Sequence, residues 1–385
     1  MKTKPIYLDY QSTTPVDPEV LESMLPYFSN VFGNPSSKGH YYGRESSAAV
    51  SLSRKIISEF FESELEDIIF TSGATESINL AIKGYAEENY KNGNHIITSQ
   101  IEHSAVLNTC KYLEKNGFEI TYLPVISNGL INPDELKNSI TEKTLLVSIQ
   151  SSNNEIGVTQ DIDTIAKICR KKNVVFHSDV TQSIGKENLD YKLFDMISLS
   201  GHKFYAPKGV GLLVIRSDSK RIKISTQTYG GGQEFGLRSG TLNVPYIVGI
   251  GKAFQLIQNN FDEHDRIISL RDRLFEGISS QIDNVYLNAD KIKRLPNNLN
   301  IYIKDVKSNQ LIDECKNICF SAAAACSTGS GKRSHVLKAI GLSDDKIDSS
   351  IRLSVGRHTT KMEIETAIEE LVKSIIKIRN INKGL

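Results

Sequence analysis

The sequence carries almost no net charge, since 46 basic and 45 acidic side chains leave a formal charge of +1 over 385 residues. A chain with no excess of either sign has no strong field to draw it to nucleic acid or to an acidic membrane surface. We therefore expect no direct nucleic-acid binding and no membrane partner.

Long apolar runs are also missing, because no stretch approaches the roughly 20 residues of a membrane-spanning helix. The first residues, MKTKPIYLDY, pass from a charged start into a strand-like segment without the apolar region of a signal peptide. The five cysteines are an odd number scattered through a long chain, which is not the pattern of a disulfide framework. The simplest expectation is a protein of the reducing cytoplasm.

The cysteines show no spacing typical of a metal site, so we expect no bound metal. Cys110 and Cys169 fall on predicted helix faces, and Cys315 falls in a helical stretch. Cys319 stands in an apolar run, which predicts a place in the core.

The length and apolar content suit two domains with a large core. Strand-like apolar runs cover residues 67–73, 94–100, 118–125, 143–150, 174–180, 196–201 and 209–216. Amphipathic helical patterns lie between several of them, at 76–90, 104–116 and 162–172. This alternation predicts an α/β fold with a mostly parallel sheet covered on both faces.

The pattern changes after about residue 250. A long charged helix is predicted over 254–282, followed by short strands at 285–288 and 298–303 and a strand-like segment at 350–356. We predict a large domain over 16–255, with residues 1–15 and 256–385 forming a smaller α+β domain.

Two polar residues stand where ligands of such a sheet bind, at the carboxyl ends of strands. Asp179 stands near the end of the strand-like run 174–180, and Lys203, 24 residues after Asp179, follows the next run. These two residues are what a protein needs to hold pyridoxal 5'-phosphate (PLP). The lysine forms a Schiff base with the aldehyde, and the carboxylate keeps the pyridine nitrogen protonated.

A phosphate site is predicted nearby. In FTSGATESINLAI a strand passes through a glycine turn into a helix, with Thr75 at the helix start. Free backbone N–H groups and the helix dipole can bind an anion there, although in most proteins Ser72 and Thr75 would be ordinary helix caps. Ser200 and His202 stand beside Lys203 and offer phosphate donors from a second loop.

Three further polar side chains follow predicted strands. His103 stands where a strand turns into a helix, so its ring could cover the cofactor and shuttle protons, or it could be a structural cap. Asn154 and Gln182 have amides that could donate to the phenolic oxygen of the cofactor, or could satisfy turn backbone instead.

Nine segments in order then resemble the cysteine desulfurases of the NifS/IscS type, which have the class V aminotransferase fold. They are IYLDYQSTTP, GNPSSKGH, FTSGATESINLAI, EHSAVL, NNEIGVTQDI, DVTQSIGK, SGHKFYAPKGVG, GGGQEFGLRSGTLN and SIRLSVGRHTT. The resemblance covers almost the whole chain. It implies the PLP-dependent transferase (type I aminotransferase) fold, with a mostly parallel seven-stranded sheet in the large domain.

The resemblance also implies a role for each matching residue. Lys203 would carry the Schiff base, Asp179 would pair with the pyridine nitrogen, Gln182 would contact the phenolic oxygen, and His103 would stack on the ring. Thr75, Ser200 and His202 would bind the phosphate, and Thr241 would reach the phosphate of a neighbouring subunit in a homodimer. Arg352 would clamp the substrate carboxylate, with Asn34 and Asn154 near the substrate.

The resemblance makes Cys326 the residue on which the specific activity depends. A cysteine in a loop of small polar residues is often incidental, but this position matches the catalytic cysteine of family members with a longer loop. The family usually has serine and glycine just before it, whereas this chain has four alanines, 322–325. The change makes the approach more apolar and less flexible, which could raise the thiol pKa or alter where the loop rests.

The implied reaction converts L-cysteine to L-alanine and leaves a persulfide on Cys326, which an acceptor or scaffold protein takes over. His103 is the candidate base for the substrate thiol. A selenocysteine lyase or an aminotransferase of the same fold would share Lys203, Asp179 and His103 without needing Cys326. A scaffold without activity is the other alternative. The motifs do not distinguish iron–sulfur cluster assembly, tRNA thiolation and DNA phosphorothioation as the destination of the sulfur.

Overall fold

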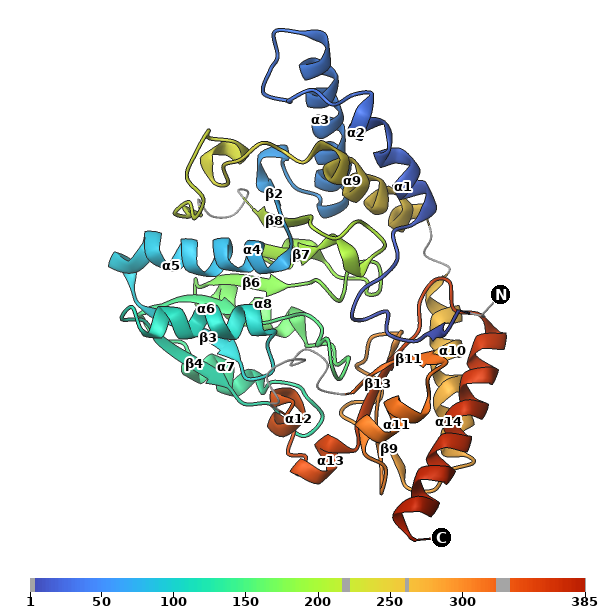
Figure 1. Cartoon of the computed structure of the whole chain (residues 1–385). Coiled ribbons are helices and arrows are strands. Elements are labelled where there is room, and N and C mark those ends of the chain that lie inside the picture. Colours follow the sequence, from blue (N-terminus) through green and yellow to red (C-terminus); the bar gives the residue numbers. More distant parts are fainter. Residues whose placement is uncertain (1–3, 217–221, 260–262, 323–332, 385) are drawn as a thin grey trace.

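A seven-stranded sheet forms the centre of the larger of two structural units in the computed structural model, which describes residues 4–216, 222–259, 263–322 and 333–384 (Figure 1). The strand order is β2-β8-β7-β6-β5-β3-β4, and only β8 runs antiparallel to its neighbours. All seven predicted strands are present, and the mostly parallel sheet is confirmed. The strands are β2 (Ile68–Thr71), β3 (His95–Ser99), β4 (Glu119–Leu123), β5 (Thr144–Ser148), β6 (Val175–Asp179), β7 (Met196–Ser200) and β8 (Gly211–Ile215).

Helices cover both faces of this sheet, and the strand residues show why. Every residue of β3, β5, β6 and β7 is buried, as expected for strands packed on both faces. Neighbouring residues alternate between two cores, so that Ile96 belongs to one and Ile97 to the other. One core includes residues of α4 (Ala74–Ile78), α5 (Gly84–Asn89) and α6 (Ser104–Glu114). The other includes residues of α1 (Pro18–Met24), α3 (Tyr41–Phe61), α7 (Pro133–Ser139), α8 (Ile162–Lys171) and α9 (Val244–Asn259).

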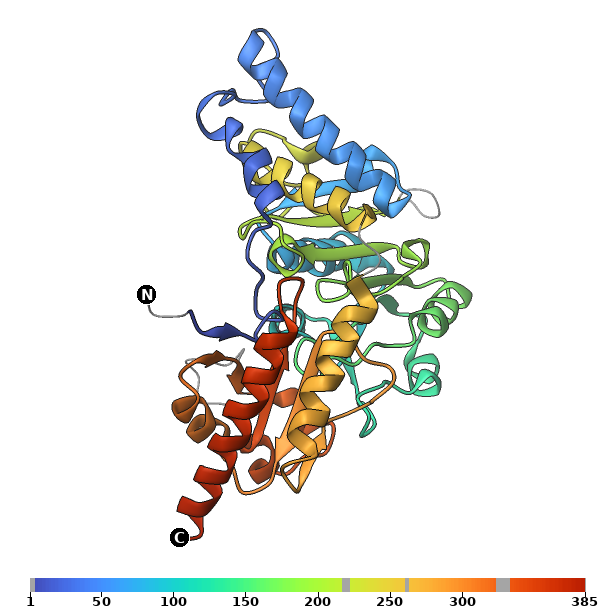
Figure 2. The ribbon, with the colours of Figure 1, turned by 90° about the vertical axis from the view of Figure 1, so that its right-hand side faces the viewer.

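The second unit is built on a four-stranded antiparallel sheet of order β12-β13-β10-β9. These strands are β9 (Val285–Leu287), β10 (Asn298–Ile303), β12 (Ser321–Ala322) and β13 (Ser350–Ser354). The helices α10 (Glu263–Ser279) and α14 (Lys361–Asn382) run side by side against it (Figure 2). The short strand β1 (Ile6–Tyr7) pairs with β11 (Ile318–Cys319), and Leu8 belongs to the core of this unit. The N-terminal segment therefore packs on the second unit, while the domain boundaries given above stay a prediction.

Two sequence predictions differ from the structure. The segment 254–282 contains the end of α9 and all of α10, which belong to different cores, and not one long helix. Cys319 is exposed, so the prediction that it lies in the core is wrong. Successive side chains of a strand point to opposite faces, and Ile318 is the one that points inward.

The remaining described elements are short. They are α2 (Pro26–Ser29), α11 (Ser308–Glu314), α12 (His335–Ala339), α13 (Asp344–Asp348), a π-helical turn η2 (Asn79–Lys83) and the 3₁₀ turns η1 (Leu65–Asp67), η3 (Tyr90–Asn92), η4 (Tyr191–Leu193), η5 (Gly201–Lys203) and η6 (Glu234–Gly236). None of the helices described is long and apolar enough to cross a membrane.

Candidate active site

Asp179 and Lys203 come from neighbouring parallel strands, as predicted from their positions. Asp179 is the last residue of β6, is 8% exposed, and accepts a hydrogen bond of 3.0 Å from the Thr181 N–H. Lys203 ends the turn η5, which directly follows β7. Its ammonium donates to the carbonyl oxygens of Gln11 and Ser12 at 2.6 and 2.7 Å. The N-terminal segment after β1 is thereby drawn over the carboxyl end of the sheet.

His103 is the N-cap of α6 and interacts electrostatically with both residues. Its Nδ1 accepts a hydrogen bond of 3.1 Å from the Ala105 N–H, so a neutral ring carries its proton on Nε2. Burial lowers the pKa of His103, and the positive charges of Lys203 and His335 lower it further against the opposing effect of Asp179. The ring is thus both a helix cap and a neutral imidazole near Lys203.

Two amides beside Lys203 have buried polar atoms without a hydrogen-bond partner in the described part of the chain. These are Oε1 of Gln182 and Nε2 of Gln11. The Gln182 Nε2 donates to the Gln11 carbonyl at 3.2 Å, and Nδ2 of Asn298 donates to the Gln11 Oε1 at 2.6 Å. Buried polar atoms normally have partners, so the two unpartnered atoms mark a place for a ligand.

The residues predicted to bind phosphate lie on two loops that meet. A Cβ placed on Gly73, which has a φ of +152°, would lie 3.4 Å from the Ser200 Oγ. Thr75 is exposed at the start of α4 and lines a cavity of about 360 Å³ together with His103. This volume is within the usual range for small-molecule sites.

His202 directly precedes Lys203 in the turn η5. Its Nδ1 is 3.1 Å from the Thr13 hydroxyl. Burial and the charges of Lys203, Lys208 and Lys186 lower the pKa of His202 to about 4. The ring is therefore neutral at pH 7 and carries one N–H donor.

Arg352 enters the site from β13 of the second unit. It is 1% exposed, and its Nη1 donates to the Asn154 carbonyl at 2.9 Å. Its Nη2 donates to the Asp9 Oδ1 at 2.8 Å and to the Ser12 Oγ at 2.6 Å. Arg352 and Lys203 thus meet at Ser12, and the structure brings Asn154 to the same place.

Two of the predicted site residues that the structure describes are not joined to this group. Asn34, between α2 and α3, and Thr241, between η6 and α9, are exposed. No hydrogen bond links the side chain of either one to Lys203 or Arg352 among the described residues. Cys326 lies outside the residues that the structure describes, as do residues 323–325 of the four alanines.

Sequence reasoning missed several residues at the site. Asp9, Gln11 and Ser12 belong to IYLDYQSTTP, a motif quoted for the resemblance, but no pattern in it signals contact with Lys203 or Arg352. Glu102, next to His103, is fully buried, and burial raises its pKa to about 8 against hydrogen bonds from Ser99 and the Gln150 N–H. The sequence gives no sign that this carboxyl is buried.

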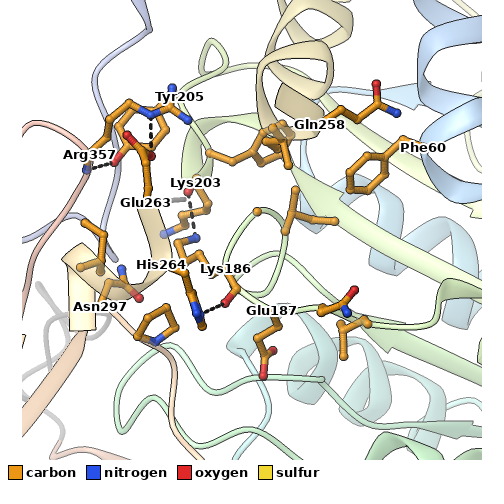
Figure 3. Close-up of a pocket in the computed structure, with 18 of the residues that line it drawn as sticks. Phe60, Lys186, Glu187, Lys203, Tyr205, Gln258, Glu263, His264, Asn297 and Arg357 are labelled. Atoms are coloured by element: carbon orange, nitrogen blue, oxygen red, sulfur yellow. Dashed lines mark hydrogen bonds and ion pairs between the residues drawn. The ribbon is translucent and has the colours of Figure 1, made fainter. Parts of the chain in front are cut away.

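Lys186, the last residue of the motif DVTQSIGK, was also missed. Its ammonium donates to the carbonyls of Gln182 and Lys203, at 3.1 Å each. Burial and the charge of Lys203 lower the pKa of Lys186 to about 7. It also lines a second cavity of about 460 Å³, to which Lys203, Glu187, His264 and Asn297 contribute (Figure 3).

This set of residues fits PLP. Lys203 offers a primary amine, Asp179 offers a buried carboxylate for the pyridine nitrogen, and Gln182 and Gln11 offer unpartnered amide atoms. His103 and Thr75 line a cavity of suitable size. Among the described residues, no group of three or more histidine, cysteine, aspartate or glutamate side chains could hold a metal ion.

Residues 6–366 match the sequence profile of the family described as Aminotransferase class-V, which gives the class. "Cysteine desulfurase IscS" from Rickettsia prowazekii (strain Madrid E) is 46% identical over 383 residues, 99% of this chain and 93% of that protein. A solved structure titled "NIFS-LIKE PROTEIN" has a TM-score of 0.88 and 35% identity, over 99% of this chain and 100% of that one. Another, titled "SspA in complex with cysteine", has a TM-score of 0.82 and 36% identity, over 93% and 100% of the two chains.

The chain belongs to the class V aminotransferase family and, within it, to the PLP-dependent cysteine desulfurases of the NifS/IscS type. The predicted family, fold, cofactor and enzyme class are thereby confirmed.

Proposed function

We propose that this chain takes the sulfur atom of L-cysteine, releases L-alanine and carries the sulfur as a persulfide on Cys326. One observation carries the proposal: Lys203 of the large unit and Arg352 of the second unit both donate hydrogen bonds to Ser12. An amine suited to cofactor chemistry and a guanidinium suited to a carboxylate therefore lie around the same residue.

We assign the cofactor contacts as follows. Asp179 would hold the proton of the pyridine nitrogen, Gln182 would contact the phenolic oxygen, and His103 would lie on the ring. When bound, PLP supplies an electron sink that stabilises negative charge at the Cα of an amino acid. Donors to its phosphate would be Thr75, Ser200 and the N–H of neutral His202.

The other steps belong to side chains of this chain. Arg352 would bind the substrate carboxylate next to Asn154, and the Lys203 amine would take the Cα proton. Neutral His103, with its lowered pKa, would accept the proton of the substrate thiol.

The sulfur transfer needs a thiolate, because the thiol itself is a poor nucleophile. The Cys326 thiolate would attack the substrate sulfur, so that a sulfur–sulfur bond forms as the carbon–sulfur bond breaks. Protonation of the carbon then gives alanine. The persulfide leaves the enzyme when a thiol of an acceptor protein attacks it.

We also propose that the working form is a homodimer. Leu25, Phe28 and Phe32, around α2, are each more than half exposed, which is unusual for large apolar side chains of a monomer. In a dimer Thr241 would reach the phosphate of the partner's cofactor, and Asn34 would lie near a substrate site.

Three further points remain predictions from the sequence. They are the acceptor protein, the cytoplasmic location, and the destination of the sulfur among iron–sulfur clusters, tRNA and DNA.

The experiment is a turnover assay of the purified holoenzyme with L-cysteine. We expect alanine and protein-bound sulfur in equal amounts in the first turnover without a reductant. An aminotransferase would pass the amino group to a keto acid and release no sulfur. A lyase that acts on selenocysteine alone would leave L-cysteine unchanged. Either of these results would contradict the proposal.

A further inference from the structure

Asp9 is the counterion of Arg352 in this structure. The Arg352 Nη2 and the Asp9 Oδ1 are 2.8 Å apart, and their side chains are 1% and 17% exposed. The Asp9 Oδ2 accepts a hydrogen bond of 2.9 Å from the Ser321 hydroxyl, and the Asp9 carbonyl accepts one of 3.1 Å from Tyr7. A buried guanidinium without a counterion is costly, and Asp9 supplies the compensating negative charge.

The hydrogen bonds of the guanidinium leave little room for a second carboxylate. Three oxygens, from Asp9, Ser12 and Ser321, lie within 3.3 Å of Nη2, which has two protons. Nη1 donates to the Asn154 carbonyl, and the Nε–H has no hydrogen-bond partner in the described part of the chain. A carboxylate bound by two N–H groups uses either Nε with Nη2 or Nη1 with Nη2. Both arrangements need Nη2.

We propose that Asp9 sets the affinity of the enzyme for its substrate by competing with the substrate carboxylate for Arg352. This inference rests on the proposed role of Arg352. A substrate must take over hydrogen bonds at Nη2, and it does so against a negative charge that already neutralises the guanidinium. Asp9 thus lowers substrate affinity while it neutralises the buried guanidinium, and it acts as a positioning residue through Arg352.

The test is Asp9→Asn in the holoenzyme, because asparagine keeps the shape and one acceptor oxygen but removes the charge. We expect the KM for L-cysteine to fall by about fivefold or more, without a matching rise in kcat. The dissociation constant of L-alanine, measured by calorimetry as a ligand that loses no sulfur, should fall by a similar factor. An unchanged or higher KM together with unchanged alanine binding overturns the inference.

Asp17→Asn is the matched control. Asp17 also stands in the N-terminal segment and pairs with an arginine just after β13, since its Oδ2 is 2.8 Å from the Arg357 Nη1. The two side chains are 11% and 16% exposed. We expect this variant to leave the KM unchanged. A fall in KM of the same size in Asp17→Asn overturns the inference, because the effect would then be one of overall charge.

Two further variants keep the result interpretable. If Asp9→Asn does not fold, Ser321→Ala removes the hydroxyl that holds the Asp9 Oδ2, and a KM lowered about twofold is then the expected result. An unchanged or higher KM in Ser321→Ala overturns the inference. Arg352→Gln tests the underlying role: a large rise in KM supports it, whatever Asp9→Asn does. If Arg352→Gln leaves the KM unchanged, the carboxylate site and the inference fail together.

Discussion

Lys203 and Arg352 share one hydrogen-bonding partner although they stand 149 positions apart and belong to different structural units. The Ser12 carbonyl accepts from the Lys203 ammonium at 2.7 Å, and the Ser12 hydroxyl accepts from the Arg352 Nη2 at 2.6 Å. The N-terminal segment is therefore the link between the amine and the guanidinium. A small change at Ser12 should affect substrate binding before it affects the cofactor, because only the hydroxyl can be altered by substitution.

We accordingly expect Ser12→Ala to change the KM for L-cysteine severalfold while PLP content stays at one per chain. The backbone carbonyl that receives the Lys203 hydrogen bond is unaffected by this substitution. Steady-state kinetics and the absorbance of bound PLP provide the measurements. Ser23→Ala, which removes a hydroxyl bonded to the Val20 carbonyl within α1, is the control. Loss of PLP from Ser12→Ala would contradict this division of roles.

Lys203→Ala should abolish turnover. Without the amine no group attaches the cofactor and none takes the Cα proton, so the loss exceeds the ~10²–10⁴ typical of one acid–base group. Alanine release from L-cysteine is the measurement. Lys208→Ala, five residues along and exposed, should retain activity. A loss of less than roughly 10²-fold would be smaller than the effect of removing a single acid–base group. If the Lys203 variant keeps that much turnover, the lysine has been misassigned.

Asp179→Asn should give a protein that still binds PLP but turns over slowly. The amide cannot hold the pyridine nitrogen protonated, so negative charge at Cα is less stabilised. A loss of about 10²-fold or more in kcat is expected, with PLP content measured by absorbance. Asp190→Asn, at an exposed residue that caps η4, is the control. Full activity in Asp179→Asn would show that another group pairs with the ring.

The raised pKa of the buried Glu102 carboxyl predicts that the free energy of unfolding depends on pH. Its pKa rises from 4.5 to about 8 in the folded protein because the carboxyl is buried. A raised pKa means that the folded state binds the proton more tightly, so this contribution to stability is complete below pH 4.5 and is lost as the pH rises to 8. Glu102→Gln, which is neutral at every pH, should therefore be stabilised relative to wild type at pH 8, on the order of a few kcal/mol. The difference should shrink towards pH 5.

Denaturant unfolding of both proteins at several pH values measures this difference. Titrating groups that both proteins contain contribute equally to the two free energies of unfolding, so their contributions cancel in the difference. A stability difference that does not vary between pH 5 and pH 8 would show that Glu102 is ionised in the folded protein.

The sheet, and the position of Asp179 and Lys203 at its carboxyl edge, could be predicted because they depend on local patterns. Strands packed on both faces read as continuous apolar runs, and the carboxyl ends of parallel strands are where ligands bind, which led to Asp179 and Lys203. The exposure of Cys319 could not be predicted in the same way. A two-residue strand is too short to reveal which of Ile318 and Cys319 points inward.

Contacts between distant segments were beyond the sequence patterns. Asp9 and Arg352 are 343 residues apart, and nothing in IYLDYQSTTP indicates that its aspartate meets an arginine of β13. The burial of Glu102 and the hydrogen bonds of Lys186 likewise depend on elements packed around them from elsewhere in the chain. Contacts of this kind follow from the tertiary structure, whereas the sequence motifs show only which residue types are present.

Cys326→Ser should separate the sulfur step from substrate binding. The substitution leaves Lys203, Asp179 and Arg352 unchanged, so L-cysteine should still bind and alter the absorbance of bound PLP. A serine hydroxyl is far from ionised at neutral pH and cannot carry a persulfide, so no sulfur should remain on the protein. The measurement is protein-bound label after incubation with ³⁵S-cysteine without a reductant. Cys319→Ser is the matched control, because Cys319 is the exposed cysteine nearest in sequence, and it should retain the label. Labelling that persists in Cys326→Ser but disappears in Cys319→Ser would move the sulfur-carrying role to Cys319.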